Sequence, residues 1–242
     1  MSIRRWNITI GLALLLGMIS MQSALAQADT DAAATAKPAP PALKHLSINL
    51  EKGYVDVDGV ICLSEGLLEL IATVPASKEH EAIISSKARP KNIHLALLML
   101  GLEPGSPGKW EYTDDKIIAH DPKGDHVRIT MRYEKDGKTV ERPVNELVRD
   151  SKTKKVMKGN EFVFAGSRIA KPAQGDPFYA ADASGDVVTL VSFPEELMAL
   201  PTAASNSNEN LVWEANTSAI PPIGTDVTLR IYAVKKVQKK DK

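Results

Sequence analysis

Hydrophobic and polar residues alternate along much of the chain after residue 45, which is the pattern of strands with one buried face. Leu46, Ile48 and Leu50 alternate with polar residues, and a longer alternation covers residues 127–133. The dipeptide Asp136-Gly137 then predicts a hairpin turn. The same reasoning predicts further strands near residues 55–57, 60–63, 67–74, 144–148, 161–165, 178–181, 186–193, 212–215 and 226–234.

Two short helices are predicted between these strands. Ser77 is a favourable N-cap for a first helix whose apolar side is residues 82–84. Pro90 suits the first position of a second helix over residues 91–100, which is apolar all round and is therefore expected to be central. Strands around one helical pair predict an α+β fold, with a mainly antiparallel sheet and a helical pair at about residues 78–101 packed against it.

The first 26 residues have the pattern of a secretory signal peptide. Arg4 and Arg5 precede an apolar stretch at residues 8–19, and Ala24-Leu25-Ala26 offers the small residues that signal peptidase requires. The mature chain is therefore expected to begin at Gln27 and to lie in the periplasm or cell envelope. No later stretch approaches the roughly 20 apolar residues of a transmembrane helix.

Composition divides the rest of the chain into three parts. Residues 27–43 are rich in alanine and proline and are expected to form a disordered spacer. Residues 44–236 show neither an internal repeat nor a long linker, so we expect a single domain. Residues 237–242 form a lysine-rich tail.

Charge and cysteine content exclude several kinds of partner and cofactor. The 30 basic and 30 acidic residues balance, so no overall field favours nucleic acid, and the expected partner is a small ligand or an envelope protein. Cys62 is the only cysteine, and one thiol cannot form an internal disulfide or hold an iron–sulfur cluster. Its apolar neighbours predict a buried, unreactive side chain.

Candidate chemistry gathers in the predicted helical pair. His80 and His94 are each three and four residues before apolar residues, so both imidazoles are expected on packed helix faces. Together with Glu69 or Glu81 they have the ligand types of a zinc or similar divalent site, or of an acid–base pair. The alternative is that both histidines are packing residues, since they do not have the His-Glu-x-x-His spacing.

A serine hydrolase is excluded by residue order. Ser167 follows a predicted strand, but Ile169 occupies the position where a nucleophile elbow has glycine, and no histidine follows in the chain.

Seven segments carry a resemblance to a known family: residues 65–70, 78–83, 87–90, 94–98, 101–105, 162–167 and 220–225. They resemble the YdjY domain family, which has exported bacterial members and is essentially uncharacterised. The resemblance implies an envelope location and makes Glu69, Lys78, His80, Glu81 and His94 candidate ligand-binding residues. Some relatives carry cysteine clusters, a pattern from which the single Cys62 departs.

Three hypotheses follow for the function. The first is a non-enzymatic periplasmic or envelope domain that binds a ligand or a partner. The second is a metal-binding protein or metal-dependent hydrolase centred on His80 and His94, with Glu81 as a further ligand. The third is a structural envelope protein.

Overall fold

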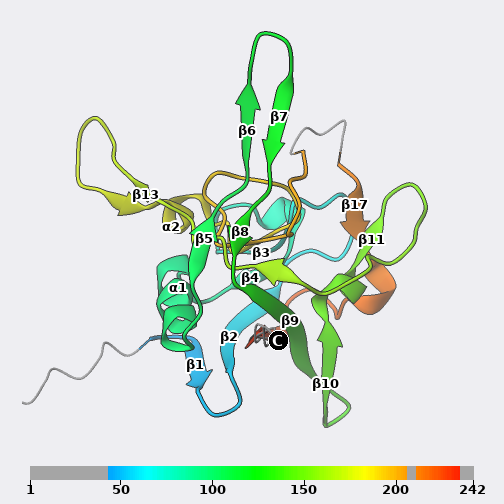
Figure 1. Ribbon diagram of the computed structural model, residues 1–242. Coiled ribbons are helices and arrows are strands. Elements are labelled where there is room, and N and C mark those ends of the chain that lie inside the picture. The colour runs from blue at the N-terminus through cyan, green and yellow to red at the C-terminus, as the bar shows by residue number, and fades with distance from the viewer. Residues whose placement is uncertain (1–42, 206–210, 235–242) are drawn as a thin grey trace, which may run out of the picture. The chain divides into compact units, whose positions relative to one another are not determined.

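The structure, a computed structural model, describes residues 43–205 and 211–234 (Figure 1). The predicted signal peptide 1–26, nearly all of the spacer 27–43 and the tail 237–242 lie outside the described residues. No helix within the described ranges has the length and apolar character needed to cross a membrane.

The described part of the chain is mostly β-structure with two α-helices. The helices are α1 (Pro90–Met99) and α2 (Ala180–Ser184), and single turns of 3-10 helix occur at Glu79–Glu81, Val144–Leu147 and Thr217–Ala219. The strands before residue 125 are β1 (Leu46–Asn49), β2 (Tyr54–Ile61), β3 (Leu70–Thr73), β4 (Ala82–Ser86), β5 (Pro104–Ser106), β6 (Lys109–Tyr112), β7 (Ile117–His120) and β8 (Lys123–Gly124). The later strands are β9 (His126–Lys135), β10 (Lys138–Pro143), β11 (Val148–Asp150), β12 (Phe162–Val163), β13 (Ile169–Ala170), β14 (Phe178–Tyr179), β15 (Val188–Thr189), β16 (Met198–Ala199), β17 (Trp213–Ala215) and β18 (Asp226–Ala233).

Eight strands close into a barrel, in the order β2-β18-β9-β12-β16-β15-β3-β4 and back to β2. The pairs β3–β4 and β15–β16 are parallel, and the other barrel pairs are antiparallel. Alternate residues of β2, β9 and β18 point into the barrel, and their buried side chains form its core. These include Val55, Val57, Ile61, Val127, Ile129, Met131, Val227, Leu229 and Ile231.

The predicted α+β fold, a mainly antiparallel sheet with a helical pair packed against it, is wrong, because the sheet closes into a barrel and the apolar residues of the first predicted helix form the strand that closes it. Glu79–Glu81 makes only one 3-10 turn, and the chain then enters β4, which pairs with both β2 and β3. All five residues of β4 are buried. A strand buried on both faces has no alternation, so its apolar run cannot be told from a short helix by pattern alone.

The second predicted helix is confirmed, but its expected central position is wrong. Helix α1 begins at Pro90 and buries Ile93, Ala96 and Leu97, while it leaves Leu95, Leu98 and Met99 partly exposed. It lies against β1, β2 and α2. The predicted turn at Asp136-Gly137 is also confirmed, since both residues have positive φ and join β9 to β10.

Candidate functional site

The structure separates the predicted site residues into two places. His94 lines a pocket between α1 and the segment that follows β12. Glu69, Lys78 and Glu81 belong to a second group of charged side chains around β3, β4 and β15. Each place is therefore considered by itself.

The pocket, which we call the His94 pocket, has a volume of about 500 Å³, within the range of small-molecule sites. Helix α1 contributes Lys91 and His94, which are three residues apart and so share a helix face. Apolar and backbone surface makes up much of the remaining wall. That wall consists of Pro104, Gly105, Ala165, Gly166, Ser167, Arg168, Ile169 and Tyr179.

A short hydrogen-bond chain determines which ring nitrogen of His94 carries the proton. The Tyr179 hydroxyl lies 2.9 Å from the His94 Nδ1 and donates to the Gly166 carbonyl oxygen, also at 2.9 Å. Since that hydroxyl proton is used on Gly166, Nδ1 must carry the proton that it shares with the tyrosine oxygen. Burial lowers the pKa of His94, so the ring is neutral near pH 7 and its Nε2 offers a lone pair.

Strained backbone forms the wall opposite α1. Gly166 and Ser167 both have positive φ, +84° and +55°, and a Cβ on Gly166 would come within 2.5 Å of the Pro104 side chain. Their amides donate to the carbonyl oxygens of Leu197 and Glu196, which hold this conformation in place. A non-glycine residue in the left-handed region is a feature that gathers at ligand sites.

Two cationic side chains stand at the mouth of the pocket. Arg168 pairs with Glu195 at 2.6 Å, and the Lys91 ammonium lies 3.9 Å from Asp182. Both cations keep about half of their side-chain surface exposed. They are therefore able to meet an anionic group that enters the pocket.

The second group centres on a buried ion pair. Lys78 donates to Asp186 at 2.8 Å and lies over the Phe193 ring, 3.5 Å from its centroid. Asp186 is fully buried, and its second oxygen, Oδ2, has no hydrogen-bond partner in the described residues. Burial and the nearby Glu81 carboxylate raise the pKa of Glu69 to about 7.

Glu196 lies next to this group and joins three segments of backbone. Its carboxylate accepts hydrogen bonds from the Gly108 amide at 2.6 Å, the Thr189 hydroxyl at 2.9 Å and the Phe193 amide at 3.1 Å. Burial raises its pKa to about 7 although all three hydrogen bonds lower it. Glu196 is therefore a structural link between the loop before β6, strand β15 and the turn before β16.

Replacing Glu69 with glutamine is expected to raise the free energy of unfolding at pH 8 by about 1 kcal/mol. The pKa of Glu69 is about 7 in the folded protein and about 4.3 when unfolded, so the folded state holds more protons between these values. Native stability therefore falls as pH rises from about 4 to about 7, and Glu69→Gln removes part of that fall. Urea denaturation at pH 5 and pH 8 measures the difference, with the exposed Glu161→Gln as control. If the free energy of unfolding falls by the same amount between pH 5 and pH 8 in Glu69→Gln and in the native protein, the raised pKa of Glu69 is contradicted.

The structure does not bring His80, His94 and Glu81 into one ligand set. His80 is largely exposed, with its Nε2 3.8 Å from Glu81, whereas His94 packs edge-on against Phe164 and Tyr179. In the described ranges, no three histidine, cysteine, aspartate or glutamate residues are placed to hold a metal ion.

Cys62 is half-buried, and its thiol donates to the Ala82 carbonyl oxygen at 3.1 Å. Burial raises the pKa of this thiol to about 11, which keeps it protonated near neutral pH.

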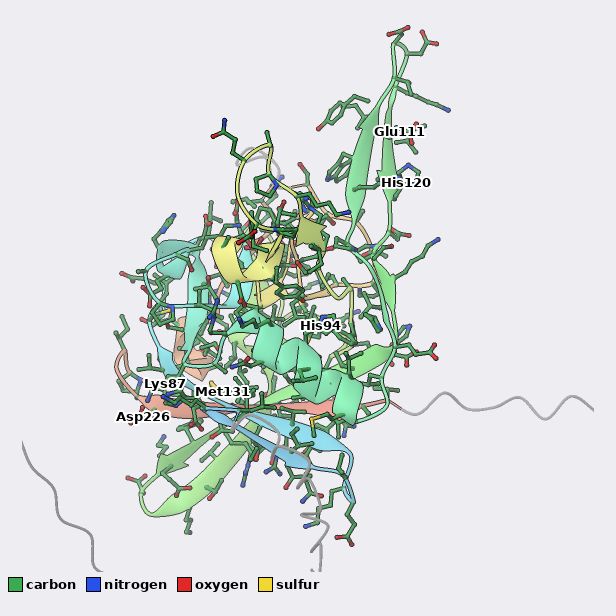
Figure 2. The ribbon with its side chains drawn as sticks, turned by 90° about the vertical axis from the view of Figure 1, so that its left-hand side faces the viewer. Lys87, His94, Glu111, His120, Met131 and Asp226 are labelled. Atoms are coloured by element: carbon green, nitrogen blue, oxygen red, sulfur yellow. The ribbon has the colours of Figure 1, made fainter. Side chains whose placement is uncertain are left out.

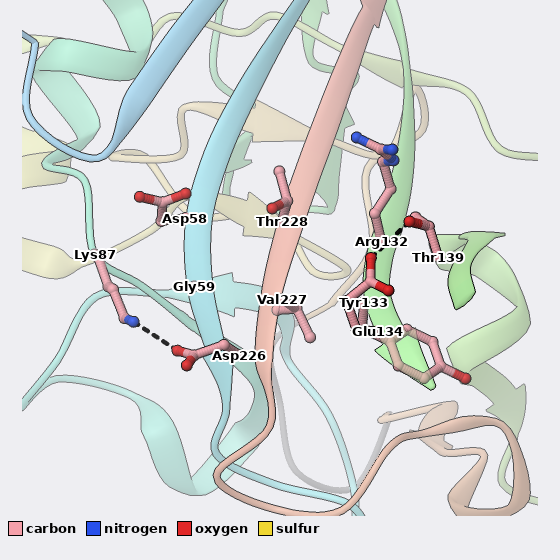
Figure 3. A pocket seen from close by; sticks show the side chains of 10 residues that line it. All are labelled: Asp58, Gly59, Lys87, Arg132, Tyr133, Glu134, Thr139, Asp226, Val227 and Thr228. Carbon is pink, nitrogen blue, oxygen red and sulfur yellow. Dashed lines mark hydrogen bonds and ion pairs between the residues drawn. The ribbon is translucent and has the colours of Figure 1, made fainter. Parts of the chain in front are cut away.

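A smaller hollow of about 280 Å³ lies on the outer wall of the barrel (Figure 3). Its charged side chains largely satisfy one another: Lys87 pairs with Asp226 at 2.7 Å, and Thr139 donates to Glu134 at 2.6 Å. None of the sequence-predicted site residues lines this hollow.

Sequence reasoning missed Tyr179, Asp186 and Glu196. Tyr179 has no local motif and meets His94 only through the fold. A weak signal was available for the two acids, since each carboxylate adjoins an apolar run, at residues 187–191 and 197–200. Charged residues beside such runs are candidates for buried, paired positions.

Comparison with known proteins identifies a domain family over most of the chain. The sequence profile of the YdjY domain matches residues 46–232. No curated protein and no solved structure matches the chain.

Proposed function

The chain belongs to the YdjY domain family, and from this premise we propose that it is a non-enzymatic binding domain whose His94 pocket holds a small ligand with an apolar body and an anionic group. One observation carries the proposal. Three segments through which the chain resembles the family, residues 94–98, 101–105 and 162–167, each contribute to this pocket. Segments far apart in sequence thus converge on a single cavity.

The chemistry of the wall supports this ligand class. Lys91 and Arg168 favour a carboxylate, sulfonate or phosphate at the mouth, while Ile169 and Pro104 favour an apolar body. The Nε2 of His94, which carries the lone pair of the neutral ring, is suited to accept a hydrogen bond from a hydroxyl or amide group of the ligand. The binding role needs no reaction, and within the described residues no hydrogen bond joins Ser167 to a histidine.

We also propose that the domain works outside the cytoplasm, in the periplasm or cell envelope. The support is the arrangement of Arg4, Arg5, the apolar residues 8–19 and the cleavage pattern that ends at Ala26. The mass of the protein recovered from a periplasmic fraction tests this proposal. A chain that begins at Gln27 supports it, and an uncleaved chain contradicts it.

Binding of 8-anilinonaphthalene-1-sulfonate, an aromatic sulfonate, is expected to be saturable in the native protein and at least 5-fold weaker in Arg168→Gln and in Ile169→Ser. The first change removes a cation from the pocket mouth and the second removes apolar wall. Fluorescence titration measures the affinity, and melting temperatures show that each variant is folded.

Two substitutions elsewhere serve as matched controls for charge and apolar surface. Lys87→Gln changes a cation of the outer hollow, and Val156→Ser changes an exposed apolar side chain. Neither should alter probe affinity. Equal affinity in the native protein and both pocket variants would overturn the proposed site.

A further inference from the structure

The hairpin formed by β6 and β7 stands away from the rest of the domain (Figures 1 and 2). Its two strands pair from Lys109↔His120 to Tyr112↔Ile117, and neither strand joins another sheet. The extensive contacts of each strand are with the other strand. A two-stranded hairpin alone in water is marginally stable, so this element gains from a surface to pack against.

One face of this hairpin, which we call the arm, is apolar and largely unprotected. Trp110, Tyr112 and Ile117 share that face, and Tyr112 and Ile117 are 74% and 62% exposed. The opposite face carries Lys109, Glu111, Ile118 and His120, and there Glu111 and His120 pair at 2.9 Å (Figure 2). An exposed apolar face bordered by charged side chains is typical of an interaction surface.

The end of the arm has the chemistry that the His94 pocket requires. Asp114 and Asp115 form an acidic tip next to the exposed aromatic ring of Tyr112, with Lys116 as the only cation of the turn. Lys91 and Arg168 stand at the mouth of the pocket, whose wall includes the apolar Ile169. The tip and the pocket are thus complementary in both charge and polarity.

The arm of one molecule is not placed to fill its own pocket. Gly105 lines the pocket, the arm begins at Lys109, and from there the hairpin leads away from the domain (Figure 2). The Gly108 amide is fixed at this root by its hydrogen bond to the buried Glu196. A fixed root that directs the tip outward favours a second molecule as the acceptor.

We propose that two copies of this chain exchange arms, so that the Tyr112–Asp115 tip of each copy occupies the His94 pocket of the other. The root of the arm adjoins the pocket, so a two-fold axis that seats one tip also seats the second. Such a reciprocal contact closes on itself and gives a dimer rather than a filament. This inference rests on the proposed function, because it needs the same pocket to accept an apolar, acidic group, and the tip and the sulfonate probe then compete for that pocket.

Sedimentation equilibrium of the protein expressed from its full sequence tests the exchange. The native protein is expected to be a dimer at micromolar concentration. The dissociation constant should rise at least 10-fold in Tyr112→Ser, in the tip variant Asp114→Lys/Asp115→Lys and in the pocket variant Lys91→Glu/Arg168→Glu. A mixture of the tip variant and the pocket variant should associate more tightly than either variant alone. In the mixed dimer each tip meets a pocket of opposite charge, whereas in a dimer of either variant each tip meets a pocket of the same charge. Ile223→Ser, which changes an exposed apolar residue elsewhere, should leave the dimer intact.

The outcomes separate this inference from the proposed function. A native protein that stays monomeric, or a dimer that none of these changes weakens, overturns the exchange. If the native protein is monomeric and binds lipid vesicles or another envelope protein through its arm, the exchange is overturned as well. When one of these outcomes has overturned the exchange, the sulfonate probe tests the pocket separately. If the probe binds both the native protein and monomeric Tyr112→Ser, the His94 pocket remains the proposed ligand site. If the probe binds neither, both proposals fail.

Discussion

Replacing Glu196 with alanine is expected to lower the free energy of unfolding by about 3–5 kcal/mol, one of the two largest effects that we predict. The side chain is fully buried, and its loss leaves the donors of Gly108, Thr189 and Phe193 without their acceptor. Each buried unsatisfied donor costs about 1–3 kcal/mol. Chemical denaturation followed by circular dichroism measures the change.

The neighbouring glutamate provides the control for this prediction. Glu195 pairs with Arg168 at the surface, so Glu195→Ala should change stability by about 1 kcal/mol or less. The stability loss of Glu196→Gln should lie between those of Glu196→Ala and Glu195→Ala. Glutamine preserves the side-chain volume but presents amide hydrogens to groups that are themselves donors. Similar stability of Glu196→Ala and Glu195→Ala would show that Glu196 does not link the three segments.

Gly105→Ala is expected to destabilise the domain by about 1–3 kcal/mol and to weaken sulfonate binding at least 10-fold. A Cβ at this position would overlap the Lys123 carbonyl group and the Gly124 amide of β8, which are backbone atoms and cannot move alone. Because Gly105 also lines the His94 pocket, displacement of β5 from β8 should deform the pocket wall. Thermal unfolding and probe titration measure the two effects.

Gly53→Ala is the control that separates the effect of a steric clash at the new Cβ from the effect of an unfavourable backbone conformation. Gly53 has φ of +67° with open space around its Cβ position, so alanine there should cost only about 1 kcal/mol and leave probe binding unchanged. If Gly105→Ala binds the probe as the native protein does, the β5 segment is not a determinant of the pocket.

The candidate site was only partly predictable from sequence. His94 is placed in a pocket and Glu69, Lys78 and Glu81 are brought near one another, but His80 is largely exposed beside Glu81. The partners that define each place come from distant segments: Tyr179 is 85 positions from His94, and Asp186 is 108 positions from Lys78. Local spacing carries no information about such pairs.

The fold likewise divides into features set by local sequence and features set by contacts between distant segments. The sequence by itself determined the alternating strands β2, β9 and β18, the Asp136-Gly137 turn, the start of α1 at Pro90 and the family, because each depends on local periodicity, backbone preference or residue identity. The strand predicted at residues 144–148 is wrong, since residues 144–147 form a turn of 3-10 helix. Only the tertiary structure decided that Ala82–Ser86 is a strand, that the sheet closes on itself and that the β6–β7 hairpin stands free. Burial on both faces removes the alternation of β4, and closure depends on which strands meet in space, a property that no single segment contains.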